Sequence, residues 1–150
     1  MNNEYKYVHD NEILAYHVDI CNKILQLSTK YYDKEKTTIT FTELLGHRFE
    51  NVTYCNIISS ITQISIDYFI DEEKKILEEG LRNAFPLCLK DSEELRAYLK
   101  DNEQKVFSIK SVLGLSGFVI AKEISIEVTN ELDGSVFYVD EAGDEIEDTQ

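Results

Sequence analysis

Two histidines and an aspartate have the spacing that comes nearest to a metal site. His17 and Asp19 lie two positions apart, which places them on one side of a strand, and His47 is available as a third ligand. The same pair also occurs without any ligand on the polar face of a sheet, and we favour that interpretation. His47 and Glu50 would face each other only on a helix, which the local pattern does not indicate. We therefore expect no metal site and no cofactor.

The three cysteines form no recognisable reactive or structural set. Cys21, Cys55 and Cys88 lie 34 and 33 residues apart, which fits neither a disulfide framework nor the paired spacing of a zinc site. Nucleophilic catalysis by Cys55 or Cys88 requires a neighbouring base, and no spacing identifies one. We expect three reduced, mostly buried thiols. Phosphate-binding glycine loops and the H-E-x-x-H and G-x-S-x-G patterns do not occur, so the sequence predicts a protein that is not an enzyme.

An acidic C-terminal segment is the strongest compositional feature. The chain has 15 basic and 29 acidic residues, for a formal net charge of −14, and residues 131–150 hold eight acidic residues and no basic one. Negative charge disfavours binding to nucleic acid or to an anionic membrane surface, and it favours a basic protein partner. The alternative is that this charge only keeps a small protein in solution.

The candidate partner-binding residues lie in this segment. They combine one aromatic side chain with four carboxylates: Tyr138, Asp140, Glu141, Asp144 and Glu145. Tyrosine beside carboxylates is typical of an interface that meets a basic partner. Alternatively, tyrosines cap the edges of a sheet and keep the hydroxyl in water, without any role in binding a partner. The acidic residues lack the D-x-D-x-D-G order of a calcium loop.

Alternating patterns near the N-terminus predict a three-stranded meander. A polar arm over residues 1–11 precedes strands at 12–20, 24–31 and 37–45. The residues expected on the buried face of the first strand are Leu14, Tyr16, Val18 and Ile20. These strands should form one side of a sheet.

Residues 46–70 have patterns that do not select one kind of secondary structure. Residues 46–56 have a weaker pattern, and the periodicity of residues 57–70 fits both a strand and a helix. We expect a turn or short strand through Ser65. From Ile66 the spacing of apolar residues predicts an amphipathic helix, which Gly80 loosens at its end.

A second helix has its own start signal. Asp91 and Glu94 have the spacing of a capping box, and a short apolar stripe follows them over 91–100. Pro86, the single proline, lies in the break between the two helices.

The most apolar stretch predicts the centre of the sheet. Residues 106–112 and 118–128 should form two long antiparallel strands joined by a turn that contains two glycines. In the second strand, the even-numbered positions other than Lys122 should form one continuous buried face.

A further strand is expected after these two. Asp133 and Gly134 predict a two-residue hairpin that leads into a strand at 135–139. The acidic tail over 140–150 should fray because of its charge density.

These elements together predict an α+β fold in a single domain over residues 1–150. The sheet should be mainly antiparallel and twisted, with about six strands, and two helices should lie between the third or fourth strand and the C-terminal strands. The N-terminus lacks the basic and apolar regions of a signal peptide, and no apolar run approaches the length of a membrane span. We expect a cytoplasmic protein.

The opening meander EILAYHVDICNKILQLSTKYYDKEKTTITFTELLGHRFENV is followed by helices and by the closing segment SIKSVLGLSGFVIAKEISIEV. This arrangement resembles small bacterial proteins of the kind found as immunity proteins beside polymorphic secreted toxins. The resemblance implies a compact acidic cytoplasmic protein that binds and blocks one toxin. It assigns no role to any single residue.

Two other classes of function stay open at this point. An α+β domain with a pocket between the curved sheet and the helices would bind a small ligand or act as an enzyme, with His17, Asp19 or His47 lining the pocket. A structural or regulatory module would have neither a basic partner nor a pocket. The leading hypothesis is a non-catalytic protein that neutralises a basic toxin.

Overall fold

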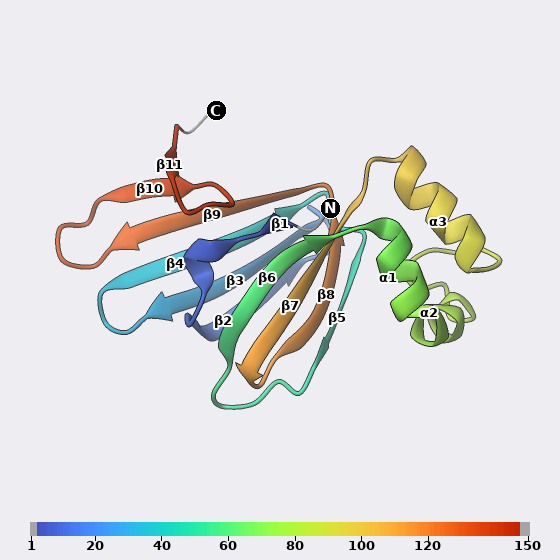
Figure 1. The fold of residues 1–150 in the computed structure, drawn as a ribbon, viewed down its shortest axis with the longest axis horizontal. Helices are drawn as coiled ribbons and strands as arrows, with labels where there is room; N and C mark the ends of the chain where they lie inside the picture. The colour runs from blue at the N-terminus through green and yellow to red at the C-terminus, as the bar shows by residue number, and fades with distance from the viewer. Residues whose placement is uncertain (1–2, 148–150) are drawn as a thin grey trace.

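The computed structural model describes residues 3–147 and has an α+β fold (Figure 1). The expected fold class is confirmed. Within the described residues, the open antiparallel sheet has eleven strands rather than about six, and there are three α-helices rather than two. The elements in chain order are β1 (Asn3–Glu4), the 3-10 helix η1 (Lys6–Val8), β2 (Glu12–Asp19), β3 (Ile24–Tyr31), β4 (Glu35–Thr42), β5 (Gly46–Glu50), β6 (Ile57–Ile64), α1 (Ile66–Glu72), α2 (Lys74–Leu81), α3 (Ser92–Asp101), β7 (Lys105–Leu113), β8 (Ser116–Ala121), β9 (Glu123–Asn130), β10 (Val136–Val139) and β11 (Glu145–Ile146).

The expected meander is present as β2, β3 and β4, which pair in sequence order. The burial of β2 differs from the prediction, because Leu14 and Ile20 are exposed and the buried residue is Ile13. A bulge after Ile13 shifts the pairing register. Tyr16 and Val18 pair with Leu27 and Leu25 and so lie on the inner face, but Tyr16 is 43% exposed and only Val18 packs against the core, because β2 meets its other neighbour, β6, at one residue pair only.

The sheet consists of two halves that enclose the main core. One half has the order β11-β10-β9-β4-β3-β2 and the other β6-β7-β8-β5, with β1 beside β6. The only pair that joins β2 to β6 is Glu12 with Ile57. Figure 1 shows the strands of the two halves running in different directions. The largest apolar side chains between the halves are Leu25, Leu27, Ile39, Phe41, Ile58, Ile61 and Phe107.

A second core lies between the helices and the outer face of the β6-β7-β8-β5 half, which is the face that points away from the main core. Phe69, Ile70, Leu77, Leu95 and Leu99 come from the helices, and Val106, Phe118 and Ile120 come from the strands. β8 is therefore covered on both faces. Its residues Phe118 and Ile120 contact the helices, whereas Val119 and Ala121 belong to the main core.

The prediction of a single long strand over 118–128 is wrong. The chain bends at Lys122, whose N–H donates to the carbonyl oxygen of Thr42 at 3.1 Å, and two strands result. β8 pairs with β7 and β5, whereas β9 pairs with β4 and β10. The bend also changes the phase of the side chains, because Ile126 and Val128 face the main core while Phe118 does not. The expected continuous buried face is therefore divided between two cores.

The ambiguous middle segment forms a strand and then a helix. β6 ends at Ile64, and α1 begins at Ile66, where the Ser65 hydroxyl accepts the Tyr68 N–H at 3.1 Å. The first helix is interrupted at Glu73, which accounts for the additional helix. The weakly patterned residues before β6 contain the edge strand β5, which has a partner on one side only.

Two local turn predictions have different outcomes. The capping signal of α3 is confirmed, because the Asp91 carboxylate accepts the Glu94 N–H at 3.0 Å. The two-residue hairpin at Gly134 is wrong. The Asn130 N–H donates to the Ser135 carbonyl at 2.9 Å around a longer loop, so β10 begins one residue later than expected.

The cysteines are more accessible than expected. All three are free, but Cys21 and Cys88 are exposed and Cys55 is half-buried. They lie in turns and irregular segments between the regular elements rather than on the inward faces of strands. In residues 3–147, no helix is long and apolar enough to cross a membrane.

An ion-pair cluster holds α3 against α1. The Arg96 guanidinium contacts Asp67 at 2.5 Å, Asp71 at 3.1 Å and Glu93 at 3.2 Å, and the Lys100 ammonium lies 2.9 Å from Asp67. Hydrogen bonds from Lys100 and then from Arg96 lower the pKa of the Asp67 carboxyl. These contacts join the two helices, both of which contribute to the second core.

The main core gives the first prediction. Ile126 is 1% exposed and lies on β9 between the two sheet halves. Ile126→Asp should leave the chain unfolded, because it buries an unpaired carboxylate and costs on the order of 4–5 kcal/mol or more. Ser125→Asp, at the exposed neighbouring position, is the matched control. Ile124→Asp should destabilise less, since Ile124 is half-buried. Circular dichroism melting measures all three, and a cooperative, native-like transition of Ile126→Asp would place this residue outside the core.

The ion-pair cluster gives the second prediction. A carboxyl whose pKa is lowered by folding adds stability above its ordinary pKa of 3.8 and loses that contribution as the pH falls through its folded-state pKa. Arg96→Met should therefore lower Tm at pH 7, and the difference from wild type should shrink at pH 3. Arg82→Met is the control, because Arg82 is exposed and has no ion pair within residues 3–147. An equal effect of Arg96→Met at both pH values would show that packing, and not charge, accounts for it.

Candidate functional site

A groove beneath the C-terminal hairpin brings together three of the five expected partner-binding residues. Tyr138, Asp140 and Glu141 line this cavity of about 240 Å³. Glu123 and Tyr5 also line it, although the sequence had indicated neither. We call this cavity the acidic groove. Asp144 and Glu145 do not line it; both are exposed on the hairpin.

The turn of the hairpin depends on Asp140. Its carboxylate accepts the Ala142 N–H at 3.0 Å and the Asp144 N–H at 2.9 Å, and its own N–H donates to the Asp144 carbonyl at 2.8 Å. These bonds allow β11 to return along β10. The tail is therefore ordered as far as residue 147, and residues 148–150 lie outside the described part. Asp140 has a structural role besides its charge.

The N-terminal segment closes one wall of the groove instead of forming a polar arm. The Lys6 N–H donates to the Glu141 carbonyl at 3.0 Å, which joins η1 to the hairpin. Tyr5 is 8% exposed and packs edge-on against Phe107, with 6.2 Å between ring centroids. Tyr7 donates a 2.6 Å hydrogen bond to Glu35. Residues 1–2 of the expected arm lie outside the described residues.

Negative charge around the groove affects the Tyr5 phenol. Burial, followed by the nearby carboxylates of Glu141 and Glu123, raises the pKa of Tyr5 to about 12. The single ammonium in the lining belongs to Lys105, which lies 4.0 Å from Glu123. The lining therefore has three carboxylates, those of Glu123, Asp140 and Glu141, and one ammonium. This net negative charge favours a bound cation.

Strand pairing explains why this groove is open. β10 pairs with β9 only from Ile126 to Thr129. The preceding residues of β9, 123–125, pair with β4 on one side and line the groove on the other. The Tyr138 hydroxyl donates to Glu127 on the neighbouring strand at 3.1 Å, which fixes this tyrosine beside the opening.

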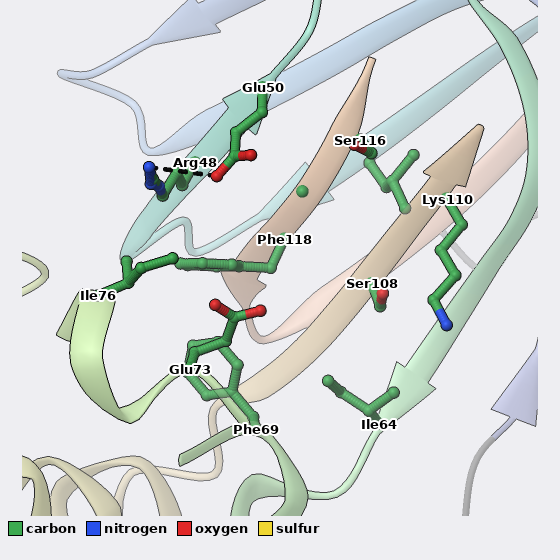
Figure 2. A pocket seen from close by; sticks show the side chains of 12 residues that line it. Arg48, Glu50, Ile64, Phe69, Glu73, Ile76, Ser108, Lys110, Ser116 and Phe118 are labelled. Atoms are coloured by element: carbon green, nitrogen blue, oxygen red, sulfur yellow. Dashed lines mark ion pairs between the residues drawn. The ribbon is translucent and has the colours of Figure 1, made fainter. Parts of the chain in front are cut away.

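A second cavity of about 270 Å³ lies between the helices and the outer face of β5, β7 and β8 (Figure 2). Figure 2 shows the Glu73 carboxylate beside the ring of Phe69, which packs edge-on against Phe118 with 4.8 Å between centroids, and the Arg48–Glu50 ion pair of 3.1 Å lies at one side. This position matches the pocket expected of a small-ligand domain. Its lining does not include His17, Asp19 or His47.

The residues whose spacing came nearest to a metal site, His17, Asp19 and His47, lie in different surroundings. The Asp19 carboxylate accepts the side-chain and then the backbone N–H groups of Asn22, and these hydrogen bonds lower its pKa. His17 is exposed on β2, whereas His47 lies on β5 against the ring of Phe49, and burial lowers the pKa of His47. Within residues 3–147, no group of three His, Cys, Asp or Glu side chains is placed to hold a metal ion.

Tyr5 gives the third prediction. Because its folded-state pKa of about 12 exceeds the ordinary value of 10.0, the unfolded chain ionises first and stability is lost as the pH rises from 10 to 12. At pH 11 this single group should cost roughly 1 kcal/mol. Tyr5→Phe should therefore lose less stability than wild type between pH 8 and pH 11 in urea unfolding. Tyr54→Phe, at a 98% exposed site, should behave as wild type. Equal losses in all three proteins would contradict the placement of Tyr5.

Comparison with known proteins does not assign the chain to a family. No protein-family model matches it, and neither does any curated protein or solved structure.

Proposed function

We propose that this chain is a non-catalytic protein-binding protein that neutralises a basic toxin in the manner of an immunity protein. The observation that carries the proposal is the lining of the acidic groove, where Glu123, Asp140 and Glu141 surround one opening and Lys105 is the single cation. The acidic residues of the described part of this segment, 131–147, extend the negative charge along the hairpin. The partner is a basic protein rather than nucleic acid or a membrane surface, and the protein acts in the cytoplasm of the cell that makes it.

A lysine or arginine side chain of the partner fits the acidic groove. Its charged end meets the carboxylates of Glu123 and Glu141, and its aliphatic part packs against Ile124 and Ile146, which also line the cavity. The wider negative field accelerates encounter, by on the order of 10- to 1000-fold at low salt. Binding should therefore weaken as salt is raised.

A second candidate function has one observation in its favour. The Glu73 carboxylate in the cavity of Figure 2 is half-buried beside the ring of Phe69 and has no hydrogen bond or ion pair within residues 3–147, although Arg48 and Lys110 also line the cavity. A carboxylate and an aromatic ring that line one cavity can bind a small cationic ligand there. The acidic groove carries more charge, and we place the main function there.

The fourth prediction tests neutralisation. The protein encoded beside this gene, produced alone in the host, should be toxic, and co-production of the wild-type chain should restore growth. Glu123→Gln combined with Glu141→Gln should weaken binding by about 2- to 25-fold, since each exposed charge pair contributes about 0.2–1 kcal/mol. Biolayer interferometry at 50 and 300 mM salt measures this change, which should lie mainly in the association rate.

The control keeps the net charge of that variant but places the changes elsewhere. Glu72→Gln with Glu78→Gln alters two exposed carboxylates on the helices and should bind as wild type. Asp140 is left unchanged because it holds the turn. If neither the neighbouring protein nor any basic host protein binds at either salt concentration, the proposed function is wrong.

A further inference from the structure

A cavity of about 590 Å³ lies where the two halves of the sheet are joined. Glu12 and Ile57, the only residue pair between β2 and β6, are both in its lining. The cavity extends from Val112 near the end of β7 to Tyr32 in the loop after β3. We call it the junction groove. A ligand in it would contact both halves of the sheet.

The groove presents apolar and aromatic surface to solvent. Val112 is 63% exposed and Tyr32 is 71% exposed. The Tyr32 ring packs edge-on against Tyr31, with 4.7 Å between centroids and 76° between planes. Tyr32 has φ +51°, a left-handed conformation that is costly for a bulky side chain. The backbone therefore holds an aromatic ring in water at the edge of this groove.

The charges of the lining are unbalanced. Asp10, Glu12 and Asp33 are acidic, and Lys30 is the single cation, which lies 3.9 Å from Asp33. The only ion-pair contact of Asp10 is with the exposed His9 at 3.5 Å, and Glu12 has none among residues 3–147. Asp10 and Glu12 therefore have no lysine or arginine partner within residues 3–147. The same groove also contains the Tyr32 ring and apolar side chains.

We propose that the junction groove binds an arginine side chain of the basic partner. A planar guanidinium can stack on the Tyr32 ring and donate hydrogen bonds to the carboxylates of Asp10 and Glu12, which a lysine ammonium cannot do together in the same geometry. The aliphatic part of the arginine packs on Ile57 and Val112. The inference rests on the proposed function, because it supplies a second contact with the same partner, separate from the acidic groove.

An NMR titration of the whole chain tests this assignment with a small probe. The probe is acetyl-Ala-Arg-Ala-amide, and its control is the same peptide with citrulline, which keeps the side-chain shape but removes the charge. The arginine peptide should shift the amide signals of Asp10, Tyr32 and Val112 in a saturable way, and the citrulline peptide should not. The lysine peptide should bind more weakly than the arginine peptide.

Two variants preserve the backbone while removing the recognition groups. Asp10 has φ +67° and Tyr32 has φ +51°, and asparagine tolerates this region, so Asp10→Asn and Tyr32→Asn should fold. Each should weaken the arginine peptide by about 2- to 5-fold, the fold-change that corresponds to an exposed charge pair or cation–π contact. Tyr54→Asn, at an exposed site outside the groove, should leave the affinity unchanged. Melting temperatures confirm that all three variants are folded.

The outcomes separate this inference from the proposed function. Equal shifts with arginine and citrulline, shifts confined to the acidic groove, or unchanged affinity in both groove variants would overturn the arginine site. A basic partner that binds wild type and Tyr32→Asn equally would also overturn it, while the proposed function would stand. An arginine peptide bound in the junction groove, together with no basic partner in the host, would instead refute the proposed function.

Discussion

The burial of β8 on both faces is the constraint on which the rest of the structure depends. Four consecutive residues, Phe118 to Ala121, are buried, so one face needs the opposite sheet half and the other needs the helices. Gly117 allows β5 to approach, because a Cβ at that position would overlap the carbonyl oxygen of Arg48. The bend at Lys122 then lets the chain leave this crowded strand and enter the other half as β9.

The candidate sites are consequences of how the two halves meet. The halves share one pair between β2 and β6, and beyond it the sheet edges separate. Elsewhere Tyr16 of β2 contacts Phe49 of β5 across the two halves, with 5.3 Å between ring centroids. The acidic groove lies at another opening, beside the part of β9 that β10 does not cover, and the junction groove lies on the shared pair itself. Carboxylates can gather there because these places remain in contact with water.

Features that depend on neighbouring residues could be predicted from the sequence. The first meander follows from side-chain alternation, and the start of α3 follows from a hydrogen bond between Asp91 and Glu94, three positions apart. The acidic character of the C-terminal segment is a property of composition alone. Each of these signals is contained in a short window of chain, so no knowledge of distant contacts was required.

Features that depend on distant residues were decided only by the tertiary structure. The edge strand β5 is half-exposed, and its sequence has no clear period. The break at Lys122 occurs because the apolar residues on its two sides pack into two different cores. Tyr5 and Glu123 are 118 positions apart and meet because η1 is tied to the C-terminal hairpin. The sequence by itself determined the class of fold and the sign of the surface charge. Which carboxylates share a groove was determined by strand pairing and by the folding of one sheet half over the other, because long-range contacts leave no periodic signal in the chain.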